Sequence, residues 1–184
     1  MEKEEQLKAL QKFRDFVIAK SKSNLKRQSF TGALSNSLDS EVKVMKNSIR
    51  FFFEMNEYGW YQDKGVKGAN PSLVTNGKQK APSSPFSYKG KKPPLQAMIT
   101  WAKVKNIRFR DEEGQYAKGD YKAIGFWLQK RVYAQGIKPS LFFTKPFEQA
   151  FKKLPDELIN AYGLEAVQLF DSIMKENFKN YGNK

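Results

Sequence analysis

Any catalytic chemistry in this sequence would depend on carboxylates, lysine or tyrosine, because its 184 residues include neither histidine nor cysteine. Those two residues supply the commonest general base, the commonest neutral metal ligand and the reactive thiolate. The run Asp111-Glu112-Glu113 could hold a divalent cation, and Glu54 and Glu57 could act as a pair. The run is more typical of a solvated turn, and the pair has no partner groups around it. We therefore expect no metal, cofactor or catalytic site, and an enzyme ranks third among the functions considered.

Basic residues are the second feature, because they give the chain a formal net charge of +14, which favours contact with polyanions. The surplus lies upstream of residue 145, since residues 145–184 contain six lysines and six acids. Residues 64–92 contain no acid and seven lysines: Lys64, Lys67, Lys78, Lys80, Lys89, Lys91 and Lys92. Phe86 and Tyr88 are too few aromatics there for a base-stacking platform. We expect a flexible basic loop, or an arm that orders on contact with a partner or a phosphate backbone.

Aromatic residues form a third group of candidates. Tyr58, Trp60 and Tyr61 lie among glycines just before the basic stretch, and Phe142 and Phe143 end a segment that reads as extended. Aromatic side chains are enriched in the cores of protein interfaces. We expect these five residues to contact another subunit or a partner protein, so the pattern predicts an assembly surface more than a catalytic pocket.

The first part of the chain is expected to form a helix and a hairpin. Apolar residues at three- and four-residue spacing predict a helix over residues 2 to about 27. Residues 29–40, rich in serine, asparagine and glycine, read as a connection. Residues 41–44 and 49–55 read as strands joined by a turn at 46–48. The second strand would place Ile49, Phe51, Phe53 and Met55 on one face and Phe52 on the other.

The rest of the chain is expected to be mostly helical. Pro93-Pro94 opens a helix, because proline is tolerated in a first turn. Asp120 is a good N-cap for a second helix, whose apolar stripe includes Trp127 and which Gly136 ends. A last helical segment runs from about 146 to 179 and restarts near Pro155.

These elements predict one α+β domain over residues 1–184. Its small antiparallel sheet would be packed by the N-terminal helix and the C-terminal helices, with the basic loop outside. No stretch approaches the roughly 18 apolar residues of a membrane span. The acidic start is unlike a signal peptide. We expect a protein made in a reducing cytoplasm that does not contact membranes.

The order of several motifs resembles the tail-completion or neck proteins of tailed bacteriophages, which include head–tail joining and tail-terminator relatives. Residues 31–38 (TGALSNSL) resemble the segment before that family's hairpin, and residues 58–65 resemble its aromatic and glycine passage. Residues 93–107 resemble a proline-led helix of longer members. Residues 136–143 (GIKPSLFF) resemble the approach to the last helix. The resemblance covers most of residues 1–160.

The resemblance implies an α+β subunit of the virion, made in the host cytoplasm, that assembles as a ring at the portal–tail junction. Such rings commonly have six- or twelve-fold symmetry, and heterologous contacts close them. The implied partners are further copies of the chain, other neck, portal-adaptor or tail proteins, and passing DNA in non-specific contact. It implies no catalysis. The alternative left open by the charge is a non-enzymatic, basic nucleic-acid-binding protein.

Overall fold

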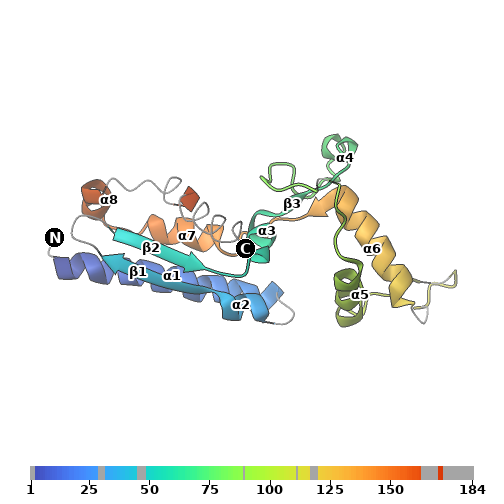
Figure 1. Ribbon diagram of the computed structural model, residues 1–184, viewed down its shortest axis with the longest axis horizontal. Coiled ribbons are helices and arrows are strands. Elements are labelled where there is room, and N and C mark those ends of the chain that lie inside the picture. Colours follow the sequence, from blue (N-terminus) through green and yellow to red (C-terminus); the bar gives the residue numbers. More distant parts are fainter. Residues whose placement is uncertain are drawn as a thin grey trace. The chain divides into compact units, whose positions relative to one another are not determined.

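The computed structural model describes residues 3–28, 32–44, 49–88, 90–110, 112–116, 120–162 and 170–171. The chain forms two compact units (Figure 1). Unit 1 combines two segments, Met1–Gly59 and Leu141–Lys184, and unit 2 is the continuous segment Trp60–Ser140. Helices and two small antiparallel sheets make this an α+β protein, as predicted. That the whole chain acts as one domain stays a prediction.

Unit 1 contains a hairpin that packs with helices from both of its chain segments. Its elements are α1 (Lys3–Gln28), α2 (Ala33–Ser37), β1 (Asp39–Val44), β2 (Ile49–Glu54), α7 (Thr144–Phe151) and α8 (Asp156–Tyr162). Helix α1 contacts β1, α2 and α7, and Figure 1 shows it running along the hairpin. Residues close to the end of the chain therefore complete a core that the first residues begin.

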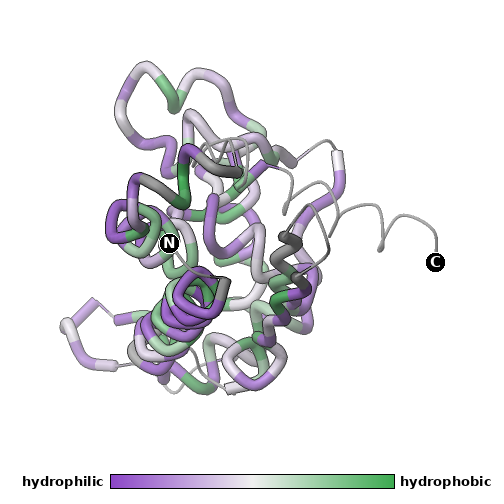
Figure 2. The backbone as a smooth tube through the Cα atoms, turned by 90° about the vertical axis from the view of Figure 1, so that its left-hand side faces the viewer, coloured by the Kyte–Doolittle hydropathy of each residue, from purple (hydrophilic) through white to green (hydrophobic). Residues whose placement is uncertain are grey.

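Helix α1 confirms the predicted N-terminal helix. Leu10, Phe13 and Val17 are buried at the expected spacing, and in Figure 2 polar and apolar colours alternate along this helix below the label N. Glu4 and Glu5 lie in the first turn, where the partial positive charge of the helix N-terminus favours carboxylates. The apolar stripe, more than this charge effect, stabilises the helix, because most helical stability in proteins comes from packing.

The hairpin confirms both predicted strands and, for Phe52, Phe53 and Met55, the predicted faces of the second one. Ser40 pairs with Phe53, and Glu41 pairs with Phe52, in an antiparallel register. Phe53 is buried, whereas Phe52 is half-buried with the Lys43 ammonium 5.1 Å from its ring centre. One face of the hairpin thus enters the core and the other carries charge. The predicted turn at 46–48 lies outside the described residues.

The predicted connection at 29–40 is wrong in part, because Ala33–Ser37 forms helix α2. Gly32 begins it with a φ of 70°, a left-handed conformation that glycine adopts readily. Leu34 and Leu38, four residues apart, are buried. Their burial outweighs the weak helix preference of the serines and asparagine between them. Residues 29–31 lie outside the described part.

The C-terminal helical segment is interrupted. Helix α7 ends at Phe151, and α8 begins at Asp156 directly after Pro155, where the sequence predicts a restart. Proline suits the first turn of a helix because its missing N–H has no partner there. Most of the predicted remainder, at 163–169 and 172–179, is outside the described residues.

Unit 2 contains α3 (Tyr58–Lys64), which crosses its boundary, and then β3 (Val66–Lys67), α4 (Ser72–Thr75), α5 (Leu95–Val104), α6 (Tyr121–Gln135) and β4 (Gly136–Ile137). The predicted helix signals hold. Pro94 precedes α5, the Asp120 carboxylate accepts from the Lys122 N–H at 2.8 Å, and Gly136 ends α6 with a φ of 83°. Ala102, Ile124 and Leu128 form the core between α5 and α6. Trp127, expected in the buried stripe, is exposed.

Within the described ranges, no helix combines the length and the apolar character that crossing a membrane would require.

Candidate assembly surface

In its described residues, the basic segment (residues 64–92) is not the free loop that the sequence predicted. It contains β3 and α4, and its backbone is tied to the end of α6. The Ala69 N–H donates to the Tyr133 carbonyl and the Lys80 N–H to the Gln135 carbonyl, each at 2.8 Å. Charge composition could not predict these bonds, because their partners lie more than fifty residues away in the chain.

Gln79 holds the segment together from inside. Its buried side-chain Oε1 accepts from the Gly68 N–H at 2.6 Å, and its Nε2 donates to the Gly68 and Asn70 carbonyls at 3.4 Å. These bonds from a buried side-chain amide satisfy backbone N–H and C=O groups that a neighbouring strand would satisfy in a sheet. The sequence signal was slight, a single neutral amide between Lys78 and Lys80.

Two of the segments that carry the family resemblance meet in unit 2. Val66 pairs with Ile137 in the β3–β4 sheet, and the Ser140 N–H and hydroxyl both donate to the Gln62 carbonyl, at 3.0 and 2.8 Å. A Cβ added at Gly65 would collide with the Ile137 carbonyl. Glycine is therefore required at this close approach. The passage after Tyr58 and the segment after Gly136 form one structural junction.

The lysines of the basic segment lie mainly at the surface. Lys78, Lys80, Lys91 and Lys92 are exposed, whereas Lys64 and Lys67 are half-buried. Lys89 lies outside the described residues. The folded backbone thus presents at least four ammonium groups to solvent, where they can contact an anionic partner.

Three of the five predicted contact aromatics are instead core residues. Trp60 and Phe143 are 0% exposed and Phe142 is 1% exposed. The Phe143 ring lies 5.2 Å from that of Phe53 in an edge-to-face arrangement. The prediction that these three residues contact a partner is wrong, because a fully buried side chain has no surface left for another chain. Large aromatics serve cores and interfaces equally, so residue type alone did not distinguish the two.

The other two predicted aromatics differ from each other. Tyr58 is 46% exposed, and its role in a partner contact stays a prediction. Tyr61 is half-buried and packs edge-to-face on Phe86, with ring centres 4.6 Å apart. Tyr88 lies 5.7 Å from Tyr133 of α6, and burial raises the pKa of the Tyr88 hydroxyl. Phe86 and Tyr88 therefore anchor the basic segment.

A cluster of exposed aromatics that the sequence did not single out lies on unit 2. Phe109 and Trp127 are 40% and 41% exposed and pack edge-to-face at 5.7 Å, and the Arg131 guanidinium lies over the Trp127 ring. Tyr116, 63% exposed, has the Arg110 guanidinium over its ring. The alternation Arg108-Phe109-Arg110 was the signal for this cluster that the sequence offered.

The carboxylate candidates remain at the surface. Glu54, Glu57, Glu112 and Glu113 are exposed, and Asp111 lies outside the described residues. In the part of the chain that the structure describes, no three acidic side chains gather to hold a metal ion.

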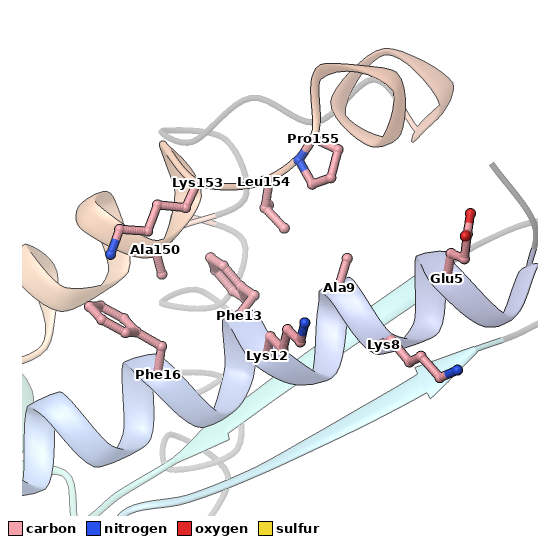
Figure 3. Close-up of a pocket in the computed structure, with 10 residues that line it drawn as sticks. All are labelled: Glu5, Lys8, Ala9, Lys12, Phe13, Phe16, Ala150, Lys153, Leu154 and Pro155. Atoms are coloured by element: carbon pink, nitrogen blue, oxygen red, sulfur yellow. The ribbon is translucent and has the colours of Figure 1, made fainter.

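A groove of about 640 Å³ lies in unit 1 between α1 and the end of α7 (Figure 3). Its lining is Glu5, Lys8, Ala9, Lys12, Phe13, Phe16, Ala150, Lys153, Leu154 and Pro155. The Lys153 ammonium lies 4.7 Å from the centre of the Phe16 ring. The groove combines an apolar floor with three lysines and one glutamate.

The carboxylates singled out from the sequence and described by the structure are exposed, whereas Asp63 is fully buried. Comparisons of the chain with family models, with curated protein sequences and with solved structures gave no significant match.

Proposed function

We propose that this chain is a structural subunit of the neck of a tailed bacteriophage. It assembles as a ring at the portal–tail junction, joins head to tail and contributes to the passage for DNA. The proposal starts from the resemblance of four sequence segments to neck and tail-completion proteins.

The observation that carries it is the junction of two of those segments. The Ser140 N–H and hydroxyl donate to the Gln62 carbonyl, although these residues lie more than seventy positions apart, and Val66, just beyond the resembling residues 58–65, pairs with Ile137. Gly65 is required where they touch. Two of the segments that resemble the family are therefore in direct contact in the folded chain, and this contact is the support that the proposal draws from the structure.

The hairpin adds support, because a ring subunit needs surfaces for its neighbours. Strands β1 and β2 form a two-stranded sheet, so each has an outer edge that no described strand pairs. Unpaired strand edges are ready sites for strand addition by another chain. Glu41, Lys43 and Glu54 on or beside the solvent face are exposed and limit uncontrolled pairing.

Negative-stain electron microscopy with mass measurement of the full chain tests the proposal. Closed rings of uniform size are expected at high concentration. A chain that stays monomeric both alone and when mixed with purified connector particles would contradict it.

A basic nucleic-acid-binding protein is the second candidate, favoured by the exposed lysines of the basic segment. It requires tight DNA binding that discriminates between sequences, whereas a neck subunit requires only weak, non-selective binding. The test variant replaces Lys78, Lys80, Lys91 and Lys92 with glutamine. The control variant replaces the equally exposed Lys103, Lys105, Lys122 and Lys130.

Salt-dependent titration of both variants with duplex DNA separates the two functions. If the basic segment binds phosphates, the test variant lowers the slope of log affinity against log salt by about 0.9 per lost contact, and the control leaves it nearly unchanged. Sequence-selective binding by the unmodified chain would favour the second candidate. Equal loss of slope in both variants would show that total charge, and not the basic segment, governs binding.

A further inference from the structure

We propose that the exposed face of helix α6 binds single-stranded nucleic acid by stacking bases on its aromatic rings. The inference does not depend on the ring of subunits, and it concerns a different part of unit 2 from the basic segment. A duplex would meet this face only through its phosphates, whereas a single strand also offers the faces of its bases.

The face belongs to the longest helix of unit 2 (Figure 1). The exposed residues of α6 are Lys122, Ala123, Phe126, Trp127, Lys130 and Arg131. Residues four positions apart are neighbours on a helix surface, so these six form two adjacent rows. In one row Phe126 lies between two lysines, and in the other Trp127 precedes Arg131. Aromatic rings and cations therefore alternate over the solvent side of one helix, which we call the α6 face.

The aromatic rings of the α6 face reach solvent, and one of them is held in position. Phe126 and Trp127 are 44% and 41% exposed. The Trp127 ring packs edge-to-face on Phe109, and the Arg131 guanidinium lies 5.0 Å from its centre. The Arg131 Nε also donates to the Gln135 Oε1 at 3.4 Å. A group that is already fixed loses less conformational freedom when a ligand binds.

Stacking is the contact that these groups offer to a base. Every nucleobase has a π-face, which stacks on aromatic rings and on the planes of arginine guanidinium groups. Among the described residues, no ring and no cation is stacked on Phe126. Its exposed ring is therefore available to a base, beside the guanidinium that Trp127 positions.

The charge around the α6 face suits a polyanion. Unit 2 contains sixteen lysines and arginines against five acids, and helices α5 and α6 contain no acid. Asp63 is buried, and Asp120 is engaged as the N-cap of α6. The other three acids are residues 111–113, which follow Arg108 and Arg110 and are nearly balanced by them. The cations of the α6 face thus remain uncompensated.

Nucleic acid fits this face better than another protein does. The ion pairs among the described residues lie elsewhere, and no carboxylate pairs with Lys122, Lys130 or Arg131. Lysine is depleted from the cores of protein interfaces, where its ammonium would lose water. A single strand covers the rings with its bases and keeps its phosphates beside the cations, which stay hydrated.

Fluorescence anisotropy with the full chain tests the inference. The probe is labelled oligodeoxythymidine of about 16 nucleotides, used alone or paired with its complement. Phe126→Leu keeps an apolar side chain but removes the π-face, so it should weaken single-strand binding about fivefold or more. Phe126→Tyr keeps a ring and should bind like the unmodified chain. The matched control is Trp101→Leu on α5, because Trp101 is 41% exposed and lies outside the α6 face.

The two probes and the salt dependence separate stacking from charge. The Phe126 ring is uncharged, so Phe126→Leu should lower single-strand affinity at every salt concentration without changing the slope of log affinity against log salt. Its affinity for the duplex should stay the same, because paired bases are covered by their neighbours. Trp127→Leu and Trp127→Phe repeat the comparison at the second ring, with circular dichroism confirming that each variant is folded.

Three outcomes would overturn the inference. The first is single-strand affinity that Phe126→Leu and Trp127→Leu both leave unchanged. The second is an equal loss in Phe126→Leu and Trp101→Leu, which would show that the α6 face has no special role. The third is polyglutamate that competes as well as the single strand and also loses affinity in Phe126→Leu, which would identify an acidic protein as the partner.

The inference and the neck function fail separately. Closed rings of a chain whose single-strand binding ignores Phe126 would retain the neck function and reject the α6 face. Single-strand binding that requires the Phe126 ring, in a chain that forms no rings on connector particles, would do the reverse.

Discussion

The Gly68 N–H donates to the Gln79 side chain at 2.6 Å, and both residues are buried. This bond lies inside a segment whose composition suggests an open loop. One neutral side chain thus organises the backbone from which the surrounding lysines project.

Gln79→Leu should therefore destabilise the segment. The side chains are similar in size, but the change removes the acceptor of a buried N–H, which costs about 1–3 kcal/mol. Gln96→Leu is the matched control, since Gln96 is exposed on α5. Urea unfolding measures the difference, and faster hydrogen exchange at Gly68 and Ala69 locates it. If both variants unfold alike and exchange is unchanged, Gln79 does not hold the segment.

Gly68→Ala should be far more damaging than Gly125→Ala. A Cβ at Gly68 meets backbone atoms of Ala134 and Gln135, which cannot move independently of the helix end. A Cβ at Gly125 meets mainly the Ile99 side chain, and alanine gains up to about 1 kcal/mol of helix propensity there. Overpacking of the first kind typically costs about 1–3 kcal/mol. Thermal unfolding of both variants should show this order, and the reverse order would contradict the close approach.

Phe143→Ala should reduce the free energy of unfolding by about 3–5 kcal/mol, because it leaves a cavity beside Phe53 and Phe147. Phe126→Ala, at an exposed position, should change it by less than about 0.5 kcal/mol. Chemical denaturation of the two variants distinguishes a core role from a contact role for Phe143. A stable Phe143→Ala variant that loses only its oligomers would restore the original interpretation.

Tyr88 predicts a loss of stability in alkali. Burial raises the pKa of its hydroxyl above the unfolded value of about 10, so the folded chain holds this proton more tightly. The resulting stabilisation is fully present below the unfolded pKa and disappears as the pH rises through the folded pKa. Above about pH 10, unfolding free energy should fall more steeply for the unmodified chain than for Tyr88→Phe. Tyr116→Phe, at a residue 63% exposed, should behave like the unmodified chain.

Local signals in the sequence predicted α1, α5, α6, the C-terminal helices and both strands of the hairpin, but not α2, α3, α4 or the β3–β4 sheet. Asp120 caps α6 and Gly136 ends it through interactions with the adjacent backbone, so neighbouring residues suffice to reveal them. The alternation around Phe53 also predicted its buried face correctly. Such features depend on periods of two to four residues, which a single sequence displays.

Features that depend on distant partners escaped prediction. Phe142 and Phe143 look the same whether a core or another subunit covers them, and only the packing of Phe143 on Phe53 decides the case. The order of the basic segment depends on Gln79 and on carbonyls of α6, far away in the sequence. Helix α2 forms because the core accepts Leu34 within it and Leu38 directly after it, against the preference of the residues between.

The hydrogen bonds between Gln62 and Ser140 have a consequence for how this chain could change length. They join a residue near the start of unit 2 to its last residue, and both ends of unit 2 lead into unit 1. Unit 2 is thus an insertion in the sequence of unit 1, and hydrogen bonds hold its two ends together. A short linker could therefore replace unit 2 and leave the packing of α1, the hairpin and α7 in unit 1 intact.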